Sequence, residues 1–225
     1  MASFGMIMPE LPGYLDLMGA GHLLGYIIGL FTLGALVSRF FSGKIADRAG
    51  RKIVMVFGTG VTAIAGFLYV LLGAVPDYST GMLGVWLFLT LRFFHGLSTG
   101  FRPIGSSALL TDIVPHNRRG EALGFLGVAG NAGMAGGPAI GSYLAVEWGY
   151  DAMFLASSFL GILSLLFTLK LPETLPNSRK VIWSDLNVFK GKNFDIAAWP
   201  AAVTLLPIAL SFGVFLTITP DFVDD

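Results

Sequence analysis

The chain has 225 residues and no net charge, with 54% of its residues hydrophobic and only 12% charged. A soluble domain is about 25% charged, so a soluble fold of this composition would expose large apolar patches that a lipid bilayer would instead solvate. The lack of excess positive charge argues against a nucleic-acid partner, and the lack of cysteine excludes disulfides and cysteine-ligated metal sites.

The apolar residues form segments long enough to cross a membrane, which takes about 20 residues of helix. The opening stretch, 1–18, starts apolar but soon meets Pro9, Glu10, Pro12 and Gly13, and we interpret it as the outer part of a first helix whose beginning is missing. Longer apolar segments follow near 21–41, 53–75, 83–110, 122–146, 152–170 and 198–219. The sequence therefore predicts an all-α membrane protein that is truncated at both ends.

Glu10 is the acidic residue of the opening segment, within the sequence PELP. A carboxylate inside a membrane segment is costly and usually serves a proton or cation site that faces a cavity. Alternatively, Glu10 is a solvated and passive acid near the outer membrane interface.

The basic residues indicate which way the segments run. Twelve of the 14 Lys and Arg residues lie in or beside the connections after the second, fourth and sixth segments, and the connections near 13–20, 76–82 and 147–151 have none. Connections rich in Lys and Arg stay on the cytoplasmic side. We therefore expect an integral, multi-pass protein of a bacterial cytoplasmic membrane, with its basic connections in the cytoplasm.

The connection after the second segment reads SGKIADRAGRK, and five of its eleven residues are charged. Orientation explains its Lys and Arg residues, but not an Asp and two glycines at fixed spacing among them. Gly43 allows close helix approach, Gly50 can adopt a left-handed turn, and Asp47 can accept hydrogen bonds from a helix N-terminus. The spaced residues are Gly43, Asp47, Arg48, Gly50, Arg51 and Lys52.

This spacing resembles motif A of the major facilitator superfamily, which lies between the second and third helices of those transporters. The resemblance implies that Asp47 locks the two halves of the transporter in an outward-facing state. Its partners in the family are a basic residue of the loop and an acid at the end of the fourth helix, and Arg51 and Asp112 fit those positions. PELP and the LPET sequence near Glu173 also resemble the ends of the first and sixth helices of the family.

The segment near 83–110 contains LRFFHGLSTG, which resembles motif B of the same family, with His95 where Gln is usual. Arg92 lies about ten residues into this segment, which is roughly 15 Å along a helix. A charge at that depth faces protein or water rather than lipid. We expect Arg92 to act in proton coupling or anion handling with His95 as a titratable neighbour; alternatively, Arg92 is a paired structural residue and His95 a packed core histidine.

The segment near 122–146 resembles motif C, which marks the drug/proton antiporter branch. Three of its glycines are spaced by four, which predicts a groove for close helix packing, and its proline is expected to bend the helix as a gating element. Asn131 is polar at depth and faces either the central cavity or a hydrogen-bond partner on another helix. The pattern consists of Gly124, Gly133, Gly137, Pro138 and Gly141.

An internal repeat predicts the organisation of the chain. LGYIIGLFTLG, at 24–34, resembles LGFLGVAGNAG 99 residues later, and Gly50 and Gly149 keep that offset. Three helices repeated as three is the inverted-repeat arrangement of many transporters. We expect a six-helix transmembrane domain over 1–174, a cytoplasmic linker over 175–197 with a possible interfacial helix, and the first helix of a second transmembrane domain over 198–225.

These patterns predict a secondary transporter rather than an enzyme, exporting small or lipophilic compounds by proton-coupled alternating access. Its expected partners are a small-molecule substrate, protons and the lipid bilayer, with no cofactor or metal. A metabolite or sugar importer of the same superfamily and a fragment without transport of its own are the alternatives. A membrane-embedded enzyme is disfavoured because His22, His95 and His116 are scattered and no HExxH or GxSxG sequence occurs.

Overall fold

The computed structural model describes residues 1–73, 82–179, 181, 200, 203–204, 207 and 211. The chain divides into two compact units, Met1–Ile182 and Trp183–Asp225. Nearly all of the second unit lies outside the described residues, and so do most of the predicted linker and of the predicted seventh span near 198–219. The fold below is that of the first unit.

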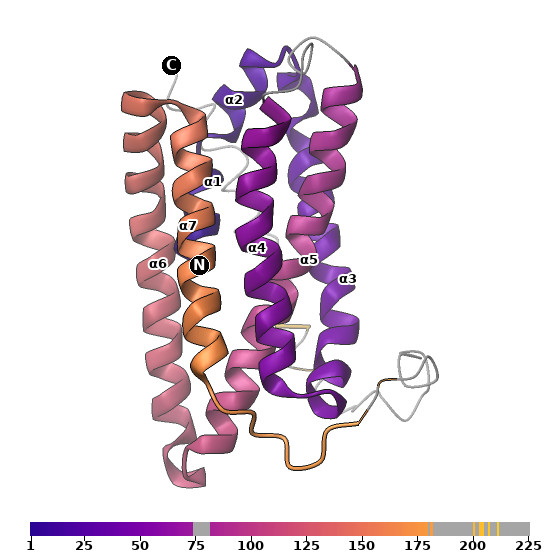
Figure 1. Cartoon of the computed structure of the whole chain (residues 1–225), viewed down its shortest axis with the longest axis vertical. Helices are drawn as coiled ribbons and strands as arrows, with labels where there is room; N and C mark the ends of the chain where they lie inside the picture. Colours follow the sequence, from indigo (N-terminus) through magenta and orange to yellow (C-terminus); the bar gives the residue numbers. More distant parts are fainter. Residues whose placement is uncertain are drawn as a thin grey trace. The chain divides into compact units, whose positions relative to one another are not determined.

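The described part of the first unit is helical and contains no strand (Figure 1). Two short 3-10 turns, Gly21–Leu23 and His116–Arg118, precede α3 and α6. The α-helices are α1 (Ala2–Ile7), α2 (Leu11–Leu17), α3 (Leu24–Arg48), α4 (Arg51–Gly73), α5 (Met82–Ile113), α6 (Arg119–Trp148) and α7 (Tyr150–Lys170).

The opening segment is a broken helix, with α1 and α2 separated at Met8–Glu10. Proline explains the interruption, because Pro9 has no N–H to donate to the preceding turn and its ring crowds that turn. Pro12 lies in the first turn of α2, where a missing N–H costs nothing.

The stretch predicted as a loop from Ser42 to Lys52 is mostly helix, which corrects the expectation from its charge. Ser42–Arg48 completes α3, and only Ala49 and Gly50 separate it from α4. Gly50 has a φ of 131°, and Gly149, which separates α6 from α7, has a φ of 86°. Both values favour glycine. The two glycines that keep the repeat offset therefore occupy equivalent tight turns.

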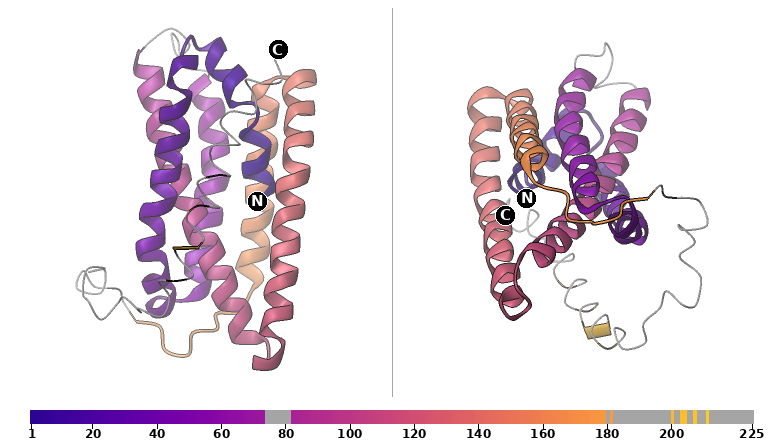
Figure 2. Two further views of the ribbon diagram at one scale, coloured as in Figure 1. Left: turned by 180° about the vertical axis from the view of Figure 1, so that it is seen from behind. Right: turned by 60° about the horizontal axis from the view of Figure 1, so that its bottom comes forward.

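The helix contacts follow the symmetry of the predicted repeat. The closely packed pairs are α3 with α5, α4 with α5, α4 with α7, α1 with α6, α1 with α7 and α6 with α7. Exchanging the first three segments (α1–α2, α3, α4) with the next three (α5, α6, α7) converts α3–α5 into α1–α6, α4–α5 into α1–α7 and α6–α7 into α3–α4, which are also in contact, and it leaves α4–α7 unchanged. In the two views of Figure 2, α6 and α7 run side by side, as do α3 and α5.

Three helical segments are long and apolar enough to cross a membrane, namely Gly21–Arg48, Arg51–Gly73 and Tyr150–Lys170. Helices α5 and α6 are longer still, at 32 and 30 residues. Large apolar side chains such as Phe67 on α4 and Phe159 on α7 are exposed. In water such surfaces would be unfavourable, whereas lipid solvates them, so the fold is that of an integral membrane protein.

Glycines bring α3 and α5 into backbone contact. A Cβ atom on Gly96 would collide with the carbonyl oxygen of Phe31, and one on Gly34 would collide with that of Phe93. Small residues at helix interfaces give this close approach in membranes, where association depends on packing rather than on apolar burial.

We predict that Gly96→Ala lowers the stability of the detergent-solubilised protein by about 1–3 kcal/mol, because the added methyl group forces two backbones apart. The matched control is Gly29→Ala on α3, where a Cβ atom would meet nothing within 4 Å. Thermal unfolding followed by circular dichroism measures both. Equal melting temperatures for the two variants would contradict the close contact.

Candidate functional site

The motif A residues meet at one end of the bundle, where α3 ends and α4 begins. Nη1 of Arg51 lies 3.1 Å from Oδ1 of Asp47, and Nε of Arg51 lies 3.1 Å from Oδ2 of Asp112, the penultimate residue of α5. The Arg51 side chain is only 15% exposed. The structure thus places Arg51 between Asp47 and Asp112, the two acids that the sequence analysis grouped with it.

The segment after α7 supplies two further members of this site. The Glu173 carboxylate accepts hydrogen bonds from the backbone N–H groups of Arg51 and Lys52, each at 3.0 Å, and so caps α4. The Thr174 hydroxyl donates to Oδ2 of Asp112 over 2.7 Å. We call Asp47, Arg51, Asp112, Glu173 and Thr174 the α4 cap network. It joins α3, α4 and α5 to the chain that follows α7.

Gly50 has a second role that the sequence did not reveal. A Cβ atom at this position would collide with the Glu173 carboxylate. Glycine is therefore needed both for its positive φ and for the space that Glu173 occupies. The LPET sequence could have drawn attention to Glu173. Nothing in that sequence indicates that Glu173 contacts the turn at Gly50, which lies 123 positions earlier.

The environment of Glu173 favours its ionised form. Partial burial acts to raise the pKa of Glu173. Hydrogen bonds from four backbone N–H groups outweigh this effect, so the pKa lies below its ordinary value of 4.5. The donors are Leu175, Arg51, Lys52 and Thr174. A carboxylate that accepts several backbone N–H bonds is stabilised in this way.

The other motif A residues lie around the network. Nζ of Lys52 donates to the carbonyl oxygen of Leu169 in α7 over 2.7 Å, and the carbonyl oxygen of Arg48 accepts from the backbone N–H of Arg179 over 2.8 Å. Gly43 has open space around it, because a Cβ atom there would meet nothing within 4 Å among the described residues. No helix of the described part approaches Gly43 closely, so its role as a point of close helix approach stays a prediction.

Arg92 is enclosed by aromatic rings from three helices. Its Cζ atom lies 5.7 Å from the ring centre of Phe31 on α3, 5.5 Å from that of Tyr69 on α4, and 5.7 Å from that of Phe88 on α5. The residue is 1% exposed, and its Nε and Nη2 atoms have no hydrogen-bond partner within the described ranges. Cation–π contacts of roughly 0.5–2 kcal/mol each offset part of the cost of burial.

His95 lies one helical turn from Arg92 and shares two of its rings. Its ring meets Phe31 edge to face at 5.5 Å, and its Nδ1 atom lies 3.3 Å from the hydroxyl of Tyr69. Its Nε2 atom has no hydrogen-bond partner in the part of the chain that the structure describes. The sequence placed Arg92 and His95 on one helix, but it did not indicate Phe31, Tyr69 or Phe88.

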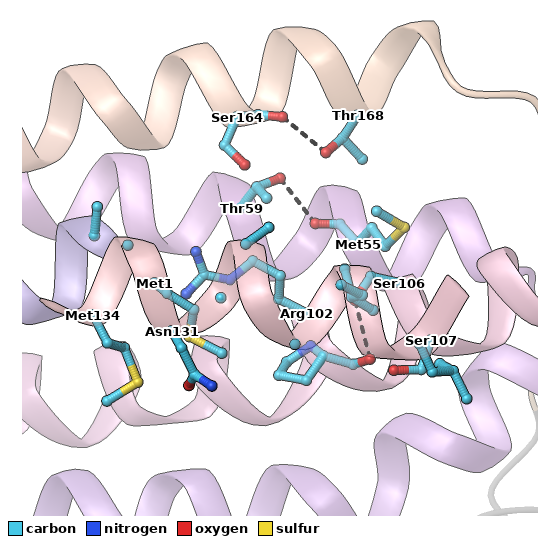
Figure 3. A pocket seen from close by; sticks show the side chains of 18 residues that line it. Met1, Met55, Thr59, Arg102, Ser106, Ser107, Asn131, Met134, Ser164 and Thr168 are labelled. Atoms are coloured by element: carbon cyan, nitrogen blue, oxygen red, sulfur yellow. Dashed lines mark hydrogen bonds between the residues drawn. The ribbon is translucent and has the colours of Figure 1, made fainter. Parts of the chain in front are cut away.

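Glu10 and Asn131 occupy different surroundings. Glu10 precedes α2 and accepts a hydrogen bond from the Ser142 hydroxyl of α6. Asn131 lines a cavity of about 620 Å³ together with Arg102, Thr59 and other residues of α4–α7 (Figure 3). The proposed coupling residues thus lie in three settings: the ring cage around Arg92 and His95, the contact between α2 and α6, and this cavity.

The glycines of α6 form a groove that α1 fills. A Cβ atom on Gly133 would lie 3.0 Å from the backbone nitrogen of Ala2, and one on Gly137 would lie 2.7 Å from its carbonyl oxygen. A Cβ atom on Gly141 would collide with the backbone of Met6. The close packing predicted from their spacing is therefore present, and its partner is α1.

The remaining residues of this glycine pattern behave differently. Gly124 has open space around it, since a Cβ atom there would meet nothing within 4 Å of the described residues. Pro138 lies inside α6, and its Cδ atom would be 3.2 Å from a Cβ atom on Gly5 of α1. Pro138 thus extends the surface against which α1 packs.

The whole chain, residues 1–225, matches the family model of the Major Facilitator Superfamily. The chain therefore belongs to this superfamily of membrane transporters. It is 30% identical to the multidrug resistance protein MdtG of Klebsiella pneumoniae (strain 342) over 233 residues, a match that covers 100% of this chain and 54% of MdtG.

Two further relatives give the same picture. MdtG of Serratia proteamaculans (strain 568) is 34% identical over 234 residues, covering 100% of this chain and 54% of its own length. The quinolone resistance protein NorA of Staphylococcus aureus (strain Mu50 / ATCC 700699) is 26% identical over 213 residues, covering 93% and 51%. The chain thus spans about half the length of the curated relatives it matches.

We predict that Glu173→Gln lowers the stability of the protein at neutral pH by about 1 kcal/mol, a modest value because the carboxylate is largely exposed. The pKa of Glu173 is lowered on folding, so its stabilisation is complete above its ordinary value of 4.5 and is lost as the pH falls through the lowered value. Melting temperatures of both proteins between pH 7 and pH 3 should therefore converge at acid pH.

The control for this prediction is Glu147→Gln, because Glu147 is an exposed acid near the C-terminal end of α6. It should leave the melting temperature unchanged across the same range. A Glu173→Gln deficit that is equally large at pH 3 and pH 7 would contradict the role of the charged carboxylate.

Proposed function

We propose that this chain forms the N-terminal half of a secondary transporter that exports small, often lipophilic compounds in exchange for protons by alternating access. The observation that carries the proposal is the fully buried Arg92 in a bundle of this superfamily. A charge at membrane depth is costly, by at least about 2.5 kcal/mol, and such residues mark ion, proton or substrate pathways. The names of the relatives, which describe multidrug and quinolone resistance, favour export over import.

Glu10 is the proposed carboxylate of the proton-coupled step. It is half-buried and lies where α2 meets α6, with Ser142 as its hydrogen-bond donor. An ionised carboxylate only accepts hydrogen bonds, whereas a protonated one also donates. A change in the charge of Glu10 would therefore alter the contact between the first and fifth segments, which belong to different repeats.

The α4 cap network is the proposed gate element at the opposite end, with Asp47 as the residue that contacts the second half of the transporter. Asp47 has a side chain that is 71% exposed although it pairs with Arg51. An exposed carboxylate held in place by a buried guanidinium can still accept hydrogen bonds from another helix. The basic connections, including this one, are proposed to face the cytoplasm.

We predict that Glu10→Gln abolishes proton-driven efflux in the full-length protein while leaving membrane insertion unchanged. The isosteric amide keeps the shape of the side chain but cannot ionise. Substrate flux into inside-out membrane vesicles, energised by an imposed pH gradient, measures the effect.

Glu147→Gln serves as the matched control, since Glu147 is an exposed acid at the end of α6 and should retain wild-type flux. If Glu10→Gln transports as well as the wild type under a pH gradient, Glu10 is not the coupling residue. Gradient-driven release of substrate from these vesicles, rather than uptake, would indicate an importer.

A further inference from the structure

Tyr69 is a buried residue of α4 that no sequence motif marks. It is 0% exposed, and its ring centre lies 5.3 Å from that of Phe88 on α5 and 5.0 Å from that of Phe154 on α7. The ring is therefore held between two helices. Its hydroxyl lies 3.3 Å from Nδ1 of His95, at the long end of the hydrogen-bonding range.

His95 offers an acceptor for the hydrogen of the Tyr69 hydroxyl. A neutral imidazole has one donor and one acceptor nitrogen, and a hydroxyl can play either part. Arg92, whose Cζ atom lies 5.5 Å from the Tyr69 ring centre, carries only donors. The Tyr69 oxygen can accept from Arg92, and Nδ1 of His95 is the contact within the described part of the chain that can accept the hydroxyl hydrogen. This arrangement favours Tyr69 as the donor, with the imidazole proton on Nε2.

Protonation of His95 would reverse this hydrogen bond. Both nitrogens of an imidazolium donate, so the Tyr69 oxygen would have to become the acceptor. The charged groups that act on His95 are Arg92 and Arg102 of its own helix, and both are cations. On the other elements packed here, α4 contributes Tyr69, α2 contributes Tyr14 behind it, and α3 contributes the uncharged Phe31.

We propose that the Tyr69 hydroxyl is a positioning group for His95: it fixes which ring nitrogen carries the proton and accepts the hydrogen bond of Nδ1 when His95 is protonated. This part of the inference rests on the proton-coupled transport proposed above. In such a transporter, Tyr69 would shift the pH at which the buried pair of Arg92 and His95 changes charge. The atoms balance in one step: a proton binds Nδ1, and the hydroxyl rotates from donor to acceptor.

The first test is nitrogen-15 NMR of the imidazole in the detergent-solubilised chain. His22→Gln and His116→Gln, both at exposed positions, leave His95 as the single histidine. We expect the neutral ring to carry its proton on Nε2. In Tyr69→Phe, which keeps the ring and removes the hydroxyl, the ratio of Nε2–H to Nδ1–H should fall about fivefold, as for the loss of one hydrogen bond of ordinary strength.

The matched control is Tyr26→Phe on α3, whose side chain is 68% exposed and should leave the ratio unchanged. A wild-type chain with its proton on Nδ1 overturns the proposal without any variant. The proposal is also overturned if the ratio of Nε2–H to Nδ1–H is the same in Tyr69→Phe as in Tyr26→Phe. This comparison requires that both variants unfold at the same temperature.

The second test measures transport by the full-length protein as a function of pH. Tyr69→Phe should shift the midpoint of the pH profile by about half a unit to one unit, and the same substitution in a His95→Gln background should shift it no further. A shift that persists without His95 overturns the proposal. If no variant, including the wild type, shows pH-driven transport, the proposed function fails, while the NMR result decides the positioning role by itself.

Discussion

A guanidinium enclosed within a membrane bundle is the constraint on which the rest of the structure depends. The Arg92 charge cannot face lipid, and no single helix can surround it. Rings from α3, α4 and α5 provide the enclosure. They converge because Gly34 and Gly96 let the backbones of α3 and α5 touch. The glycine content of the chain and its buried charge are therefore linked, since close helix approach is what brings aromatic rings around the cation.

Polar contacts tie the two three-segment repeats together at both ends of the bundle. At one end, Ser142 of the second repeat donates to Glu10 of the first. At the other, Asp112 at the end of α5 and Glu173 after α7 hold Arg51 of α4. Between them, buried hydroxyl groups also join the repeats: Ser3 of α1 pairs with Ser157 of α7, and Thr62 of α4 pairs with Ser98 of α5. Glu10 and the α4 cap network are among the places where charged groups of one repeat contact the other, so a change of charge there would alter how the repeats pack.

The α4 cap network also joins the helix bundle to the first residues after α7 by hydrogen bonds. Glu173 belongs to the first residues after α7, yet it caps a helix from the other repeat. Any force transmitted along the segment that leaves α7 therefore reaches the N-terminus of α4 directly. The combination of a positive φ and a carboxylate against Gly50 explains why this turn accepts no side chain.

The sequence by itself determined the membrane class, the positions of the long helices between residues 21 and 170 and the glycine repeat, because apolar length, basic asymmetry and glycine spacing are local or periodic signals. It also paired Arg51 with Asp112 through a family resemblance. Only the tertiary structure decided that Glu173 caps α4, that α1 fills the α6 groove and that Tyr69 meets His95. These contacts join residues from different helices, whose rotation and depth depend on packing that no single segment encodes. For the same reason the sequence could not indicate which helix, if any, approaches Gly43, which has open space around it among the described residues.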